Sequence, residues 1–210
     1  MKVCKFGGTS MATAASVTNV KNIILSDPDR KFVVVSAPGK RFSGDTKVTD
    51  LLYAAYAEQQ KNGDVIRLLD EIKSRFVTLA TEMKVEIDWD SEFKTIYDGI
   101  ARSATDDYAA SRGEYLSAVL MAKVLDFDFV DAAELIKFRK DGSFDAMLTN
   151  DLVKKRLKHA EKGVVVPGFY GRLPDRTIKT FSRGGSDFTG AIIARGVAAD
   201  IYENWTDVDG

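Results

Sequence analysis

The sequence predicts an α/β fold built around a largely parallel sheet. Strand-like and helix-like segments alternate along most of the 210 residues, the pattern of parallel strands joined by crossover helices. The run Phe32 to Ser36 is almost entirely apolar, as expected for a strand that is buried on both faces of such a sheet. The chain is 45% apolar and 29% charged, which is the composition of a globular domain.

The opening strand and helix are predicted from their boundary residues. The strand is expected over Val3 to Phe6, ending at the pair Gly7-Gly8. Thr9 or Ser10 is expected to cap the next helix, because a hydroxyl oxygen accepts hydrogen bonds from the free amides of a first turn. Pro28 disfavours helical geometry at the residue before it, so this helix is expected to stop there.

The later elements follow the same alternation. An irregular basic loop opens at Pro38 and Gly39. Helices are expected over residues 48–60, 107–125, 150–160 and from the second glycine pair to about 197. Strands are expected over residues 127–130, 164–167, 177–181 and 200–205.

The stretch 64–105 differs from the rest, because two helical patterns follow one another without a strand between them. Their apolar positions recur at helical spacing, which indicates packing surfaces rather than a cofactor site. We therefore expect a helical insertion or subdomain on the sheet. The apolar positions are Val65, Leu68, Leu69, Ile72, Phe76, Leu79 and Met83, then Phe93, Ile96, Tyr97 and Ile100.

Composition argues against several classes of function. The net charge of -1 gives no general attraction for nucleic acid or anionic lipid. No run approaches the roughly 20 apolar residues that cross a bilayer, and the start lacks a signal-peptide stretch. The only cysteine, Cys4, excludes an internal disulfide and favours a reducing compartment. It is expected to be a buried structural thiol, and the protein to be cytoplasmic.

Two segments share a layout that suits an anionic ligand: KFGGTS at 5–10 and RGGSD at 183–187. Each joins a strand, a cation (Lys5 or Arg183), a glycine pair and a hydroxyl residue before a helix. Glycines allow close approach of the backbone, and a helix N-terminus attracts phosphate or carboxylate. A tight turn without a ligand is the alternative for either segment, but their joint occurrence favours binding. The Walker A and G-x-G-x-x-G spacings are absent.

The segment VCKFGGTSM at 3–11 resembles the aspartate kinase signature. Three further segments resemble motifs of that family, in the same order along the chain: Arg112-Gly113-Glu114, SRGGSDFT at 182–189 and WTDV at 205–208. The resemblance implies the amino acid kinase fold, a three-layer αβα sandwich. It also implies ATP and Mg²⁺ as cofactors and L-aspartate as substrate.

The resemblance implies roles for individual residues. Lys5 and Asp187 would be catalytic, with Asp187 orienting Lys5. The nucleotide would contact Lys5, Gly7, Gly8, Thr9, Ser10, Thr206 and Asp207. Aspartate would contact Ser36, Thr49, Glu114, Arg183 and Ser186. Taken without the family, Glu114 is better explained as a first-turn carboxylate that complements a helix dipole.

The implied reaction needs no general base, because a side-chain carboxylate with a pKa of about 3.9 is already ionised at neutral pH. Positioning and charge stabilisation then carry the catalysis. The only histidine, His159, lies in a basic run and receives no role. No metal site of protein ligands is predicted, and Mg²⁺ is expected to arrive with ATP. The pairs Asp106-Asp107 and Asp207/Asp209 are interpreted as a helix start and a turn.

Residues 1–210 are expected to form an amino acid kinase domain truncated at its C-terminal end, without regulatory ACT domains. The predicted function is ATP-dependent formation of 4-phospho-L-aspartate, the first step toward lysine, threonine and methionine, by a protein that is homo-oligomeric at full length. One alternative is that this chain only binds aspartate or phosphate without turnover. Another is a different amino acid kinase, such as an acetylglutamate or uridylate kinase.

Overall fold

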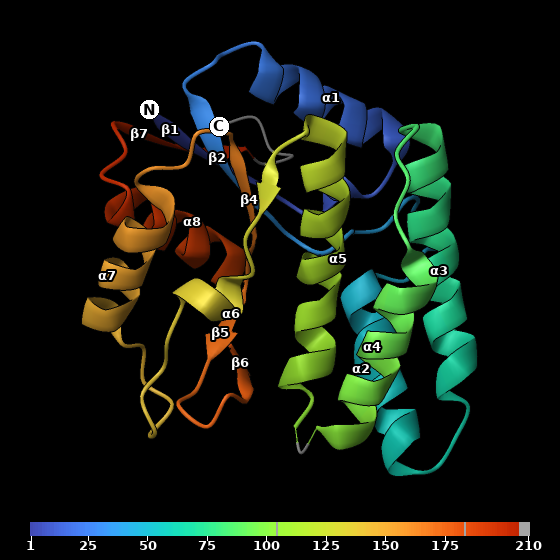
Figure 1. Ribbon diagram of the computed structural model, residues 1–210. Helices are drawn as coiled ribbons and strands as arrows, with labels where there is room; N and C mark the ends of the chain where they lie inside the picture. Colours follow the sequence, from blue (N-terminus) through green and yellow to red (C-terminus); the bar gives the residue numbers. More distant parts are fainter. Residues whose placement is uncertain (104, 183, 206–210) are drawn as a thin grey trace.

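The sheet at the centre of the molecule is parallel, as predicted. The computed structural model describes residues 1–103, 105–182 and 184–205 (Figure 1). Five strands lie in the order β3-β4-β2-β1-β7, and every neighbouring pair among them is parallel. Their bounds are β1 Lys2–Phe6, β2 Arg30–Val35, β3 Asp128–Phe129, β4 Val164–Pro167 and β7 Ile201–Trp205.

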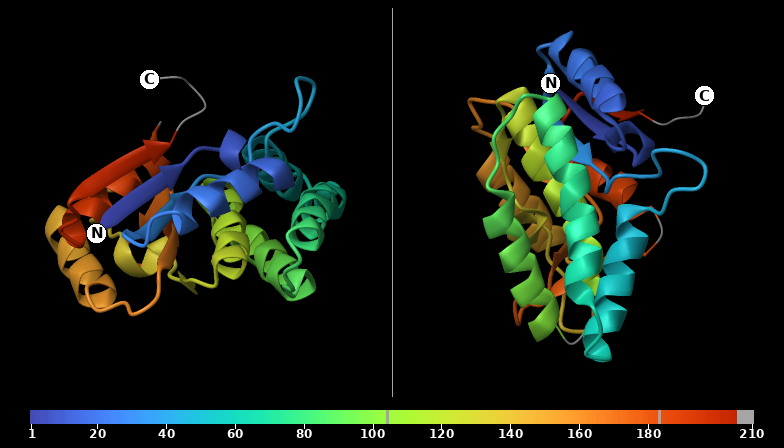
Figure 2. Two further views of the ribbon diagram at one scale, coloured as in Figure 1. Left: turned by 90° about the horizontal axis from the view of Figure 1, so that it is seen from above. Right: turned by 90° about the vertical axis from the view of Figure 1, so that its right-hand side faces the viewer.

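Helices cover both faces of this sheet, so the three-layer sandwich is confirmed. Alternate strand residues point to opposite faces: Val33 joins one apolar cluster and Val34 the other. The first cluster includes side chains from α1 (Ala14–Leu25), α2 (Val48–Gln60) and α5 (Asp107–Leu125). The second includes α6 (Ala132–Leu135), α7 (Ala146–Leu157) and α8 (Gly185–Gly196). Figure 2 shows the two helical layers on opposite sides of the strands.

The helices predicted within 64–105 are α3 (Val65–Glu82) and α4 (Trp89–Arg102). Both pack with α2 and α5 in the first cluster rather than forming a separate core. Phe76 of α3 meets Trp89 of α4 with ring centroids 5.4 Å apart. The stripes are therefore packing surfaces, as predicted, except that Tyr97 is exposed and lies outside the cluster. Their status as an insertion stays a prediction. Among the described residues, no helix is both long and apolar enough to cross a membrane.

The cap predicted for the first α-helix is wrong. Thr9–Met11 form a short 3₁₀ helix, η1, because the amides of Ser10 and Met11 bond back to the carbonyls of Gly7 and Gly8. The α-helix begins only at Ala14, and Thr13 is its cap: Thr13 Oγ1 accepts from the amide of Ser16 at 3.2 Å. Ser16 Oγ accepts in return from the amide of Thr13 at 3.1 Å, which completes a capping box.

The start of α7 and the pairing of β6 also differ from expectation. Helix α7 begins at Ala146 rather than near 150, because Asp145 caps it through the amide of Leu148. The strand expected over 177–181 is β6 (Ile178–Thr180), but it pairs antiparallel with β5 (Tyr170–Arg172) outside the main sheet. Its Thr180 amide bonds to Asp107 at the start of α5, at 3.0 Å. Helices α2 and α5 have the predicted bounds.

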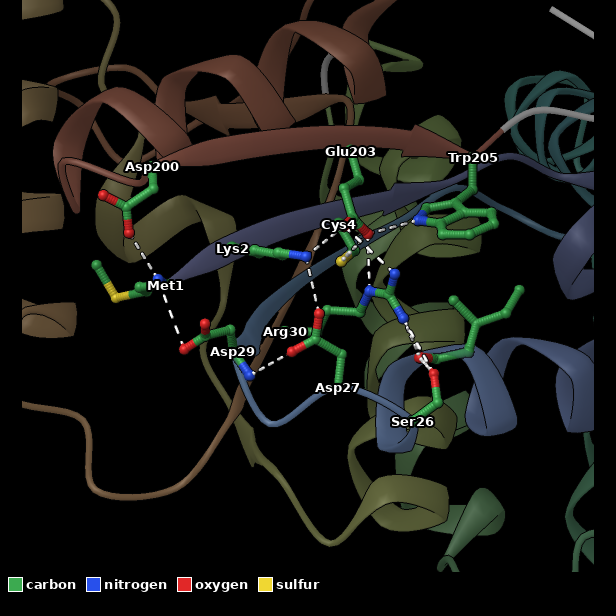
Figure 3. A network of polar contacts seen from close by, with 11 residues as sticks. Met1, Lys2, Cys4, Ser26, Asp27, Asp29, Arg30, Asp200, Glu203 and Trp205 are labelled. Carbon is green, nitrogen blue, oxygen red and sulfur yellow. Dashed lines mark hydrogen bonds and ion pairs between the residues drawn. The ribbon is translucent and has the colours of Figure 1, made fainter.

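A polar network ties β7 to β1 and β2 (Figure 3). The Glu203 carboxylate accepts from Arg30 Nε at 2.8 Å, Trp205 Nε1 at 3.0 Å and Cys4 Sγ at 3.3 Å. Burial alone would raise the pKa of Glu203, but these donors hold it at about 2. Burial and the neighbouring carboxylate raise the pKa of Cys4 to about 12. The predicted burial of this thiol is confirmed.

Candidate active site

The cation of the first glycine turn is held by an ion pair. Lys5 lies in β1 on the face covered by α8, and its Nζ is 2.7 Å from Oδ1 of Asp187. Asp187 stands in the first turn of α8, where the helix dipole favours a carboxylate. A Cβ placed on Gly7 would lie 3.8 Å from Lys5 Nζ. The ammonium group of the buried Lys5 side chain therefore lies directly beside the glycine turn.

Glycines bring the loops after β1 and β2 into backbone contact. The Gly39 amide donates to the carbonyl of Gly8 at 2.8 Å. A Cβ on Gly8 would lie 2.9 Å from the Ala37 carbonyl oxygen, and one on Gly39 would lie 3.0 Å from the Gly8 carbonyl carbon. These separations leave no room for a side chain, so the close approach requires glycine at both positions.

The second glycine turn opens its helix, as predicted. Gly184 adopts a left-handed φ of 75° as the N-cap, and α8 begins at Gly185. A Cβ on Gly185 would meet the Phe169 ring at 2.7 Å, and one on Gly168 would meet Ser186 Oγ at 2.6 Å. The helix start therefore packs against the loop that follows β4. Arg183, predicted to bind substrate, lies outside the described residues.

A pocket of about 590 Å³ opens beside the first glycine turn. The loop cations Lys40 and Lys47 line it as well, and both are exposed. Five predicted site residues line it, namely Gly8, Thr9, Ser36, Thr49 and Glu114. The pocket wall thus combines the positive charge of the lysines, backbone at a glycine turn and the carboxyl group of Glu114.

Glu114 is a buried carboxyl group that forms no ion pair with the described residues. It lies in the middle of α5, not in its first turn, so the helix-dipole explanation is wrong. The side chain is buried, and among the described residues its Oε2 has no hydrogen-bond partner. Burial raises its pKa to about 8, although the Ala37 amide acts in the opposite direction. A cationic group entering the pocket would supply the missing partner.

The structure brings most of the predicted residues to two adjoining places. Lys5, Gly7 and Asp187 form the first, and the pocket lined by Gly8 and Thr9 is the second. Ser10 lies apart from both, in a smaller groove that it shares with Trp205. Thr206 and Asp207, predicted to contact nucleotide, lie outside the described residues.

Two supporting residues were not predicted. Thr189 is buried in α8, and its Oγ1 accepts from the Phe169 amide at 3.1 Å, so it holds the β4 loop against the helix start. The Tyr202 hydroxyl donates to the Asp187 carbonyl at 3.0 Å. Thr189 belongs to a segment that the sequence had already singled out, whereas nothing local distinguishes Tyr202.

Comparison with known proteins agrees with this geometry. The family model described as "Amino acid kinase family" matches residues 1–210. Aspartokinase 3 of Bacillus subtilis is 37% identical and aligns with 100% of this chain and 49% of its own length. Lysine-sensitive aspartokinase 3 of Escherichia coli is 29% identical, over 99% of this chain and 49% of its own.

Solved structures give the same result. The crystal structure of Clostridium acetobutylicum aspartate kinase superimposes with a TM-score of 0.95 and 44% identity, over 100% of this chain and 48% of its own. E. coli aspartokinase III in complex with aspartate and ADP gives a TM-score of 0.82 at 25% identity, over 100% and 50%. The chain spans about half the length of the curated relatives it matches.

Proposed function

Because the chain belongs to the amino acid kinase family over residues 1–210, we propose that its protein phosphorylates the side-chain carboxylate of L-aspartate with ATP. The product would be 4-phospho-L-aspartate, and the reaction would be the first step toward lysine, threonine and methionine. One observation carries the proposal: the ion pair between buried Lys5 and half-exposed Asp187 at a glycine turn adjoins a pocket with the unpaired carboxyl of Glu114. The similarity to aspartokinases supports it.

The nucleotide phosphates would lie at the first glycine turn. Lys5 would neutralise charge on the transferring phosphoryl group, and Asp187 would hold the ammonium in place. Backbone amides at Gly7 and Gly8 are suited to phosphate oxygens, because successive N–H groups form anion-binding concavities. Thr206 and Asp207 would continue the nucleotide site.

L-Aspartate would occupy the pocket of about 590 Å³. Glu114, once ionised, would bind the α-ammonium group, and Ser36 and Thr49 would donate hydrogen bonds from the pocket wall. Arg183 would pair with the α-carboxylate through its planar fork, and Ser186 would help to line the site. The β-carboxylate would then face the glycine turn and the γ-phosphate.

The substrate carboxylate is already ionised at neutral pH, so positioning and charge neutralisation are the tasks left to the protein. Among the described residues, no group of three or more His, Cys, Asp or Glu side chains is placed to hold a metal ion. We infer that Mg²⁺ enters with ATP, held by phosphate oxygens and water, and neutralises phosphate charge. A cytoplasmic location fits this biosynthetic chemistry, and homo-oligomerisation of the full-length protein stays a prediction.

The test is coupled ADP release from Mg-ATP with L-aspartate, compared with L-glutamate. The assay should be run on the 210-residue chain and on any longer protein that contains it. Lys5→Ala should lower turnover by at least about 100-fold, whereas the exposed Lys31→Ala should not change it. Circular dichroism would confirm that both variants fold.

Each outcome separates the alternatives. If only a longer protein turns over, the 210-residue chain binds ligand without catalysing the reaction. Preference for L-glutamate or another acceptor would assign a different amino acid kinase. Absence of turnover from folded protein of both lengths would contradict the proposed function.

A further inference from the structure

A second pocket, of about 800 Å³, lies across α5 from the candidate active site. It is bounded by the end of α4, the first half of α5, the loop after β3 and the β5–β6 hairpin, which packs along α5 (Figure 1). No described residue lines both pockets. Four arginines line this one: Arg102, Arg112, Arg172 and Arg176.

Arg112 is the buried member of this arginine set, with 6% of its surface exposed. Its guanidinium carbon lies 4.6 Å from the ring centroids of Tyr108 and Tyr115 and 5.1 Å from that of Tyr170. Nε and Nη2 donate to the neighbouring Ser111 Oγ, at 3.0 and 2.9 Å. Its guanidinium group forms no ion pair with a carboxylate of the described residues, although Asp131 acts on it electrostatically. The tyrosine faces compensate only part of the desolvation of a buried charge.

The rest of the lining is also positive. Among the described residues, Arg102, Arg172 and Arg176 form no ion pair, unlike Arg30 and Arg75, whose guanidinium groups contact carboxylates. This leaves an excess of positive charge around an open volume, in a chain whose net charge is -1.

The two acids of the pocket lining, Asp131 and Asp175, accept hydrogen bonds from nearby groups. Asp131 accepts from the Tyr170 hydroxyl and from the Ala133 amide, both at 2.8 Å. Asp175 accepts from the Thr177 amide at 2.9 Å. Hydrogen bonds from neutral donors do not cancel the charge of a carboxylate, and Asp131 acts electrostatically on Arg112. The four arginines nevertheless outnumber the two acids of the lining.

We propose that this pocket binds a multivalent oxyanion, a phosphate ester or a di- or tricarboxylate. Arg112 would meet one charged group at the base, because a guanidinium held between aromatic faces presents its N–H edge to a planar or tetrahedral oxyanion. Arg102, Arg172 and Arg176 would meet the others nearer the surface. Helix α5 carries Arg112 into this site and Glu114 into the candidate active site. The inference does not depend on the proposed function.

Calorimetric titration of the chain with citrate and with inorganic pyrophosphate, at constant ionic strength, tests the proposal. The double variant Arg102→Gln/Arg176→Gln alters only exposed positions and should weaken binding by about 10-fold or more. The double variant Arg67→Gln/Arg195→Gln makes the same charge change at exposed positions outside this pocket, and should leave affinity unchanged. Arg112→Met should abolish binding while keeping an apolar stem between the rings.

A phosphate at the first glycine turn is the competing explanation, and Lys5→Gln separates the two. Binding that survives Lys5→Gln and is lost with the pocket arginines supports the proposal. The relative affinity for citrate and pyrophosphate then identifies the preferred group. Binding lost in Lys5→Gln but kept in the Arg102/Arg176 variant overturns it. The proposal is also overturned if the Arg67/Arg195 control loses as much affinity as the Arg102/Arg176 variant. It is likewise overturned if the unaltered chain binds neither anion at millimolar concentrations.

Discussion

The substitution Glu114→Gln replaces the unpaired buried carboxyl of α5 with a neutral group of the same shape. Burial raises the pKa of Glu114 from its ordinary 4.5 to about 8. Between these values the folded chain keeps a proton that the unfolded chain has released. Stability from this group is therefore greatest below the ordinary pKa and falls as the pH rises toward the folded pKa. Glutamine removes that dependence and can still accept from the Ala37 amide.

The magnitude follows from the proton count. One bound proton changes the free energy of unfolding by about 1.4 kcal/mol per pH unit. From about pH 5.5 to about pH 7.5, the unaltered chain should therefore lose roughly 2–3 kcal/mol that the variant keeps. Other titrating groups are common to both proteins and cancel in the comparison.

Urea denaturation of both proteins at the two pH values measures the effect. The stability of Glu114→Gln relative to the unaltered chain should rise across the interval, while the exposed Glu82→Gln should show no such trend. A difference that stays constant within about 0.5 kcal/mol would refute the reasoning, because Glu114 would then be ionised, and therefore partnered, in the folded protein.

Three further predictions concern affinity, packing and the strand network. Affinity for L-aspartate should increase from about pH 6 to about pH 8 as Glu114 loses its proton, and calorimetry of Glu114→Gln should show weaker, pH-independent binding; an unchanged pH profile would exclude the role. Gly8→Ala should cost about 1–3 kcal/mol and lower turnover, because its Cβ would lie 2.9 Å from a carbonyl oxygen. Gly44→Ala meets nothing closer than 3.8 Å and is the matched control; equal denaturation midpoints would contradict the close approach. Glu203→Gln should destabilise by about 2–3 kcal/mol at neutral pH. Since the pKa of Glu203 is about 2, its stabilisation is present above the ordinary pKa and lost as pH falls toward 2, so acid titration of the variant should be flatter.

Local sequence determined the elements whose signals are local. The continuous apolar run of β2 and the bounds of α2 and α5 follow from hydrophobic patterning, and all were predicted. Choices between equivalent neighbours were not decidable in this way. Thr9, Ser10 and Thr13 all carry hydroxyls, and only the 3₁₀ turn that leaves the sheet made Thr13 the cap.

In the candidate site, too, some features follow from local sequence and others depend on the tertiary structure. The cation and glycine motifs identified Lys5 and the anion-binding turn, since each motif is contiguous in the chain. The partners of those groups depend on chain crossings. The family resemblance had already paired Asp187 with Lys5, whereas only the tertiary structure left Glu114 in a pocket wall without an ion-pair partner among the described residues. It also left Arg112 facing a separate volume. Burial and ion pairing are properties of assembled neighbours, and therefore only the packed fold could decide them.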